Sequence, residues 1–148
     1  MPPDLRVVPV ADASVVVDWV APGADPVSPA LAVLDRLVSS GAELLAPRLL
    51  LHEVSNALLT GVRRKRWTGH AADTAYALLR ELPVRLVDEP ADLDRAWELA
   101  RRYDDHPVYD MVYVALAERS QTTLITAGEP LRRCLVGLRW VVSPDEFR

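Results

Sequence analysis

The sequence predicts an α/β protein in which a mainly parallel sheet of about five strands is covered by helices on both faces. Short apolar runs typical of buried strands alternate with longer segments that repeat apolar residues at helical spacing. Strands that alternate with helices form parallel sheets, because a crossover helix joins each strand to the next. No internal repeat, low-complexity tract or long linker divides the 148 residues, so we expect a single domain over 1–148.

The first half of the chain begins with a predicted strand over 6–11, whose apolar run contains a proline that can interrupt regular pairing. A helix is predicted over 28–41, where Ser28 is placed to cap the start and Gly41 to end the last turn. A short apolar run then predicts a second strand over 42–47.

The rest of the chain repeats this alternation. Apolar residues at helical spacing predict helices over 48–67 and 68–82, and the following apolar run predicts a strand with a turn over 83–90. Helical spacing recurs over 91–105 and again over 106–120, where a proline suits the first turn. The remaining elements are a strand over 122–127, a short helix over 129–134 and a strand over 138–142.

Composition limits the function classes. Half of the residues are apolar, and 17 basic against 21 acidic side chains leave a net charge of −4. This balance argues against a surface that binds nucleic acid throughout, but it permits a local basic face. The single cysteine, Cys134, excludes an internal disulfide and suits a reducing compartment. The N-terminus lacks a signal-peptide pattern, and no apolar run approaches the roughly 20 residues of a membrane span, so we expect a cytoplasmic protein without a membrane partner.

Three carboxylates stand among apolar residues. Asp12 ends the first strand, Glu53 lies inside an apolar helix, and Asp110 lies in the first turns of another. Burying an unpaired carboxylate is costly, and a hard divalent cation would stabilise all three together. Oxygen ligands favour Mg²⁺ or Mn²⁺ over zinc. The alternatives remain open: Asp12 can be a turn or capping residue, Glu53 can face solvent, and Asp110 can stabilise the positive end of its helix.

Polar neighbours extend this hypothesis. Asn56 follows Glu53 at a spacing that places both on one side of the helix, where an amide can orient a carboxylate or a metal-bound water. Ser14 can do the same for Asp12, or it can cap a following helix. His106 precedes a proline and is interpreted as a cap or loop residue. The four tryptophans, Trp19, Trp67, Trp97 and Trp140, are interpreted as core or dimer contacts.

Four segments together resemble the PIN-domain ribonucleases, and among these the VapC-type toxins of bacterial toxin–antitoxin pairs. They are "VADASVVVDW", "HEVSNALL", "VYDMVYVALAE" and "LITAGEPL", in the order and approximate spacing of that family. The resemblance implies a three-layer α/β/α sandwich, Mg²⁺- or Mn²⁺-dependent cleavage of RNA, a homodimer, and inhibition by a cognate VapB-type antitoxin. It places the family's catalytic and metal-binding acids on Asp12, Glu53 and Asp110, with Ser14 and Asn56 at supporting positions.

The fourth segment departs from the family. An aspartate usually follows its threonine and alanine, but this chain has Gly128 there, and Glu129 comes one residue late. Thr126 remains and can hydrogen-bond a water of the site. Three carboxylates can still hold one Mg²⁺, so a ribonuclease is the first hypothesis. The alternative is a catalytically impaired PIN-like module that binds without cleaving, of which Gly128 would be the mark.

An RNA substrate would need basic side chains outside the acidic site, because clustered carboxylates repel phosphates. The run "RRKR" at the end of the Glu53 helix contains Arg63 and Arg64, which also suit the negative end of a helix. Arg132 and Arg133 follow the fourth strand and are nearer the predicted site. These four arginines are the predicted RNA-binding residues.

Overall fold

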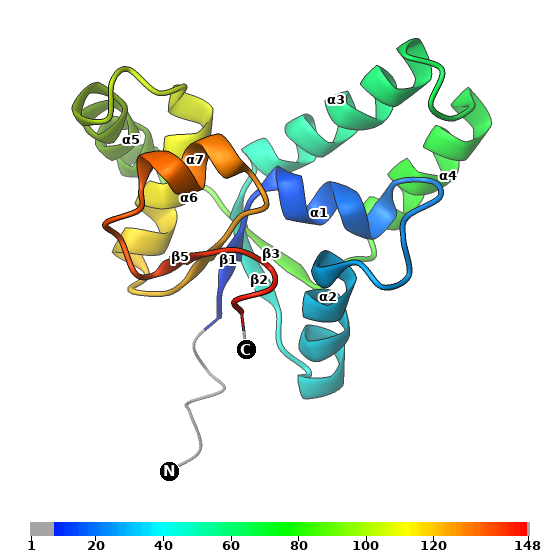
Figure 1. Cartoon of the computed structure of the whole chain (residues 1–148), viewed down its shortest axis with the longest axis horizontal. Helices are drawn as coiled ribbons and strands as arrows, with labels where there is room; N and C mark the ends of the chain where they lie inside the picture. Colours follow the sequence, from blue (N-terminus) through cyan, green and yellow to red (C-terminus); the bar gives the residue numbers. More distant parts are fainter. Residues whose placement is uncertain (1–7, 148) are drawn as a thin grey trace.

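The structure, a computed structural model, describes residues 8–147 and confirms the α/β class. Five strands form one sheet in the order β3-β2-β1-β4-β5, and every neighbouring pair is parallel. Figure 1 shows α1 to α4 on one side of the strands and α5 to α7 on the other, which makes three layers. The strands are β1 (Val10–Ala11), β2 (Leu44–Pro47), β3 (Val84–Val87), β4 (Leu124–Ile125) and β5 (Val141–Val142).

The helices connect these strands in the expected order. Asp12, Ser28 and Thr68 cap three of them, each by a side-chain oxygen that accepts a backbone N–H of the first turn. Gly41 ends α2 with the left-handed φ of 66° that glycine adopts without strain. The helices are α1 (Ala13–Val20), α2 (Pro29–Ser40), α3 (Leu49–Arg63), α4 (Gly69–Leu79), α5 (Pro90–Arg102), α6 (Val108–Arg119) and α7 (Glu129–Cys134).

The strands are shorter than predicted. The run 6–11 contributes only Val10–Ala11 to the sheet, and its first two residues lie outside the described part of the chain. The run 138–142 contributes only Val141–Val142. Apolar runs mark burial, but a residue joins the sheet only where a neighbouring strand offers backbone partners, and β1 pairs over a single step with β2.

The sequence predicts no bounds for α1, which follows Asp12 directly. Its run of three valines favours a strand by propensity, since β-branched side chains fit an extended backbone well. Burial decides otherwise: Val15 and Val16 are fully buried, and Trp19 donates its indole N–H to the carbonyl of Ala30, 2.6 Å away. Packing of α1 against α2 therefore overrides the local preference.

Helix α6 runs through the centre of one layer. It contacts β1, β2 and β4, and six of its twelve residues are buried. A helix that leads back to the amino end of a strand begins at the carboxyl edge of the sheet. The first turn of α6, which contains Asp110, therefore lies at the same edge as the residues that follow β1, β2 and β4.

Candidate functional site

The candidate site lies at the carboxyl ends of β1 and β4. The chain goes from β1 to β2 and β3 on one side of β1, and then returns to β4 on the other side. Helices on opposite faces diverge at such a switch point and leave room for a ligand. Asp12 follows β1, Thr126 follows β4, and the N–H of Asp12 donates to the carbonyl of Ile125 at 3.2 Å.

Asp12 is both a helix cap and a buried carboxylate. Its Oδ1 accepts the backbone N–H of Ser14 at 3.1 Å and also the Ser14 hydroxyl. Only 6% of the residue is exposed. The alternatives that the sequence leaves open are thus compatible, since one oxygen caps α1 while the group as a whole lies at the carboxyl edge of the sheet.

The surroundings of Asp12 raise its pKa from 3.8 to about 6. Burial is the largest cause, and the negative charge of Asp110 adds to it, whereas hydrogen bonds from Ser14 and Thr126 lower the pKa in part. Among the described residues, neither Lys nor Arg forms an ion pair with Asp12, Glu53 or Asp110. The charge of Asp12 is therefore stabilised by the hydroxyl groups of Ser14 and Thr126 and by the backbone N–H of Ser14.

The variant Asp12→Asn should be more stable than the wild-type protein at neutral pH in EDTA. An acid whose pKa is raised on folding stabilises the folded state below its unfolded pKa of 3.8, and this stability is lost as the pH rises through about 6. We expect the variant's advantage in the free energy of unfolding to grow over this window to about 3 kcal/mol. Asparagine retains the cap. Parallel stability profiles of the two proteins from pH 4 to pH 8 would contradict the argument.

Glu53 lies one turn into α3 and is half-buried. Its Oε1 accepts the hydroxyl of Tyr113 at 2.6 Å, and Tyr113 is fully buried. Burial raises the pKa of Glu53, the Tyr113 hydrogen bond lowers it, and the charge of Asp110 raises it further. The same site raises the pKa of the Tyr113 hydroxyl, through burial and through Glu53. Tyr113 therefore remains a neutral donor that orients Glu53.

Asp110 is half-buried in the first turn of α6, and its charge acts on both other carboxylates. Its Oδ2 lies 2.7 Å from Nε2 of His106, one helical turn earlier in sequence. His106 lies in the loop before α6, as expected, and it also contacts Asp110. Asp110 repels both Asp12 and Glu53, and each of the three acids contacts a different polar side chain: Ser14, Tyr113 or His106.

The donor set fits a hard divalent cation in charge and in ligand type. Its oxygens carry negative charge and lack a Lys or Arg partner among the described residues, and Asp110 destabilises the charges of Asp12 and Glu53, which a cation would reverse. Within residues 8–147, however, no three His, Cys, Asp or Glu side chains are close enough to ligate one ion as they stand. Mg²⁺ usually keeps several waters and takes only one or two carboxylates directly, which suits such an open arrangement.

The predicted supporting residues divide into two groups. Ser14 and Thr126 belong to the site: Ser14 Oγ accepts the N–H of Ala127 at 2.9 Å and lies 3.4 Å from Thr126 Oγ1. Asn56 is exposed and makes no hydrogen bond with Glu53 in the described part of the chain. Glu129 is also exposed and pairs with Arg133 at 3.2 Å, and its charge is not among the causes that raise the pKa of Asp12 or Glu53.

Gly128 has a backbone that any residue could adopt, with φ −72°. Its N–H donates to Thr126 Oγ1 at 3.0 Å. A Cβ added at this position would lie 3.3 Å from the same oxygen, which is a tight contact. Glycine here lets the loop close over Thr126, and Thr126 in turn stabilises the charge of Asp12.

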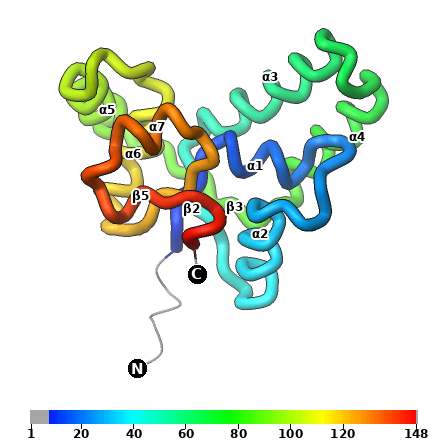
Figure 2. Tube along the Cα trace, in the orientation of Figure 1, coloured from blue at the N-terminus to red at the C-terminus, as the bar shows by residue number. Residues whose placement is uncertain are grey.

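The predicted RNA-binding arginines lie in two places. Arg63 and Arg64 are exposed at the end of α3, and the connection from α3 to α4 forms the outer end of a helical arm (Figures 1 and 2). Ten residues of helix separate Arg63 from Glu53, which corresponds to about 15 Å. On α7, Arg133 is exposed, whereas Arg132 is half-buried and lowers the pKa of Glu146. The Nε of Arg132 is buried without a partner among residues 8–147.

Neither the hydrogen bond of Tyr113 to Glu53 nor the contact of His106 with Asp110 was predicted from the sequence. Both residues carry a signal that helical spacing could have provided. Tyr113 comes three residues after Asp110, and His106 comes four residues before it, so all three share one side of the helix and its lead-in. A polar aromatic residue in an otherwise apolar helix face is the sort of residue to examine for a partner.

The fold and the side chains at the carboxyl edge of the sheet define an α/β protein with acidic groups near the switch point of a parallel sheet. The model of the PIN domain family matches residues 10–134, and the chain belongs to this family. PIN domains are generally nucleases, a class of hydrolases, and generally use divalent metals.

Comparison with solved structures supports the same fold. The chain is similar to the crystal structure of PAE2754 from Pyrobaculum aerophilum, with 22% sequence identity and a TM-score of 0.66. The similarity covers 94% of this chain and 85% of that chain. A search of the curated proteins found no significant match. Within residues 8–147, none of the helices combines the length and the apolar composition needed to cross a membrane.

Proposed function

We propose that this protein is a metal-dependent ribonuclease that cleaves phosphodiester bonds of RNA, with Asp12, Glu53 and Asp110 holding Mg²⁺ or Mn²⁺. The observation that carries the proposal is the charge of Asp110, which raises the pKa of both Asp12 and Glu53 at the switch point of the sheet. Acids that destabilise one another without a cationic partner are typical of sites that hold a cation.

Three polar side chains hold the carboxylates of this proposed site in position. Ser14, Tyr113 and His106 each orient one carboxylate, so its negative oxygens are directed before any substrate arrives. A bound divalent metal would supply a water of lowered pKa and would neutralise charge on the phosphate. Because the pKa of Asp12 is about 6, metal affinity should increase as the pH rises through that value.

The decisive experiment incubates the full chain with labelled RNA in Mg²⁺, in Mn²⁺ and in EDTA, alongside a calorimetric titration with Mn²⁺. Cleavage that requires the metal and returns when it is restored supports a ribonuclease. RNA binding without cleavage, or the absence of Mn²⁺ binding, supports the impaired module instead. Gly128 in place of the family's usual acid is the feature that favours this second candidate.

Removal of the Tyr113 hydroxyl should weaken metal binding. In Tyr113→Phe, Glu53 loses the donor that orients it, and loss of such a supporting hydrogen bond typically reduces metal affinity by about 10- to 100-fold. The matched control is Tyr109→Phe, on the same helix but 59% exposed. Mn²⁺ calorimetry, with thermal melting to verify folding, compares the two. Equal affinities in both variants would remove Tyr113 from the site.

The arginine pairs predict the salt dependence of RNA binding. Each Arg–phosphate contact to a single strand contributes about 0.7 to the slope of log affinity against log salt. If both members of a pair bind phosphate, Arg63→Gln/Arg64→Gln or Arg132→Gln/Arg133→Gln should reduce that slope by about 1.4. The control is Arg80→Gln/Arg85→Gln, which removes the same charge from the residue after α4 and from β3. Slopes equal to that of the control for both pairs would place the RNA elsewhere.

We further propose that the protein is the toxin of a VapBC-type pair, that it forms a homodimer, and that a cognate VapB-type antitoxin blocks its site. The support is the resemblance of four segments to VapC-type toxins. Co-expression with the product of a small neighbouring gene for a DNA-binding protein tests the antitoxin, since a cognate partner should co-purify and abolish cleavage. Sedimentation of the chain alone tests the dimer.

A further inference from the structure

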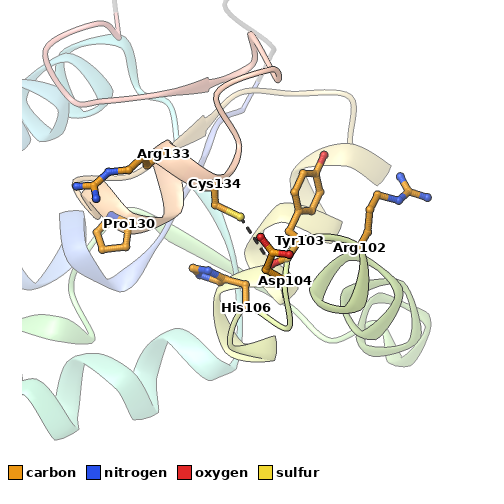
Figure 3. Close-up of a pocket in the computed structure, with 7 residues that line it drawn as sticks. All are labelled: Arg102, Tyr103, Asp104, His106, Pro130, Arg133 and Cys134. Carbon is orange, nitrogen blue, oxygen red and sulfur yellow. Dashed lines mark hydrogen bonds between the residues drawn. The ribbon is translucent and has the colours of Figure 1, made fainter.

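A cavity of about 500 Å³ lies beside the acidic site, between the α5–α6 loop and α7 (Figure 3). The ring of His106 forms part of its wall, and Nε2 of the same ring lies 2.7 Å from Asp110 Oδ2. The cavity and the acidic site are therefore separated by a single side chain. A ligand in the cavity would lie next to whatever occupies the acidic site.

The walls combine apolar and aromatic side chains with charged groups. Tyr103, Pro130 and Cys134 supply apolar and aromatic atoms, on which a planar ring can pack. Arg102 and Arg133 also line the cavity and are exposed. In Figure 3 the guanidinium group of Arg102 points away from the other labelled side chains, whereas that of Arg133 lies on the opposite side, near Pro130. Arg133 pairs with Glu129 at 3.2 Å, and both arginines are exposed, so a phosphate backbone could contact them. Apolar and aromatic atoms flanked by cations are typical of single-stranded RNA binding.

Asp104 provides the hydrogen-bonding group of the cavity. It adopts a left-handed backbone with φ 57°, as does Asp105 with φ 56°, so the chain reverses sharply after α5. Two contacts hold this turn: Arg101 pairs with Asp105 at 2.7 Å, and the N–H of His106 donates to the carbonyl of Tyr103. Figure 3 shows Asp104 next to Cys134. Burial is the larger cause of the raised pKa of Cys134, and the charge of Asp104 adds to it.

An ionised carboxylate only accepts hydrogen bonds, and it accepts two parallel N–H groups best. Among the four RNA bases, only guanine presents two adjacent donors on one edge, its ring N1–H and its exocyclic amino group. Uracil presents one donor between two carbonyl oxygens, which would repel the carboxylate. Adenine and cytosine present one amino group beside an unprotonated ring nitrogen. The cavity chemistry therefore favours guanine.

We propose that this cavity receives one guanine of a single-stranded RNA, adjacent to the phosphodiester at the acidic site, with Asp104 accepting its two N–H groups. The identity of the ligand as RNA rests on the proposed function. Arg102 and Arg133 bind the flanking phosphates, and Tyr103 and Pro130 pack against the base. The cavity is thus the element that selects where an RNA is placed for cleavage.

The first test measures the binding of guanosine and uridine 5′-monophosphates to the full chain by calorimetry in EDTA. We expect guanosine monophosphate to bind about tenfold more tightly or better, since a bidentate base contact discriminates by this amount. Asp104→Asn should remove this preference, because one of the two acceptor oxygens becomes an NH2 group that donates and would face a donor of guanine, while the left-handed backbone remains accessible to asparagine. Asp105→Asn is the matched control, with the same backbone and a carboxylate that pairs with Arg101.

Equal binding of the two nucleotides by the wild-type chain, or equal behaviour of Asp104→Asn and Asp105→Asn, would overturn the proposal. A third variant, Cys134→Phe, places a larger side chain in the cavity wall and should weaken nucleotide binding; unchanged binding would also overturn the proposal. The test in EDTA does not depend on cleavage, so its failure is distinct from failure of the ribonuclease function. In Mg²⁺, RNAs that differ only by guanine or uracil at one position should be cleaved differently by the wild-type chain and alike by Asp104→Asn.

Discussion

Asp110→Asn is expected to reduce RNA cleavage by about 10³-fold, because the charge stabilisation that a held metal supplies amounts to several kcal/mol. Asp110 is the member of the site whose charge reaches both other acids. Asparagine keeps an oxygen that can accept from His106 and suits the first turn of α6, so the fold should remain intact. The measurement is the single-turnover rate on labelled RNA at saturating Mg²⁺.

Glu129→Gln is the informative comparison for this prediction. The sequence places Glu129 one residue beyond the family's fourth acid, whereas the structure has it exposed and paired with Arg133. We expect the variant to cleave at a rate close to that of the wild-type protein. A loss in Glu129→Gln as large as that in Asp110→Asn would show that the loop at Gly128 brings this carboxylate into the working site.

Trp19→Ala should reduce the free energy of unfolding by about 3–5 kcal/mol, which is the typical cost of truncating a buried tryptophan. Only 7% of Trp19 is exposed, and its indole N–H donates to the carbonyl of Ala30 at 2.6 Å. The variant leaves a cavity between α1 and α2 and removes the side-chain hydrogen bond to the carbonyl of Ala30. Because small domains are stable by only about 5–15 kcal/mol, denaturant titration should resolve the change readily.

Trp97→Ala is the matched control, since 63% of that side chain is exposed. Its free energy of unfolding should change by no more than about 0.5 kcal/mol, as is usual for surface substitutions. Similar losses in the two variants would contradict the assignment of Trp19 alone to the core. A loss at Trp97 that depends on protein concentration would place this residue in a dimer interface.

The two tryptophans illustrate what sequence reasoning could not resolve. Both stand in segments with helical spacing, and from the sequence both are interpreted as core or dimer contacts. Periodicity identifies which residues share one side of a helix, but it does not state what that side packs against. In the structure, Trp19 is buried against α2, whereas Trp97 is exposed to solvent.

Asp12 shows a different limit. From the sequence, a capping residue and a site carboxylate are rival interpretations of the same position. The hydrogen bond from the N–H of Ser14 shows that Asp12 caps α1. Asp12 is also buried and lies close enough to Asp110 for that charge to raise its pKa, so the two interpretations hold together. A cap needs local chain geometry alone, whereas the acidic neighbourhood requires the first turn of α6 to reach the same edge of the sheet.

By itself, the sequence determined the class of fold, the alternation of strands and helices, and the three acids that stand among apolar residues, because these depend on local patterns of apolar residues and caps. Only the tertiary structure decided that Tyr113 orients Glu53, that His106 contacts Asp110, and that Asn56 and Glu129 are exposed to solvent. These relations join residues on different elements or on the lead-in to a helix. Strand order and helix packing set such distances, and neither is encoded in any local stretch of the chain.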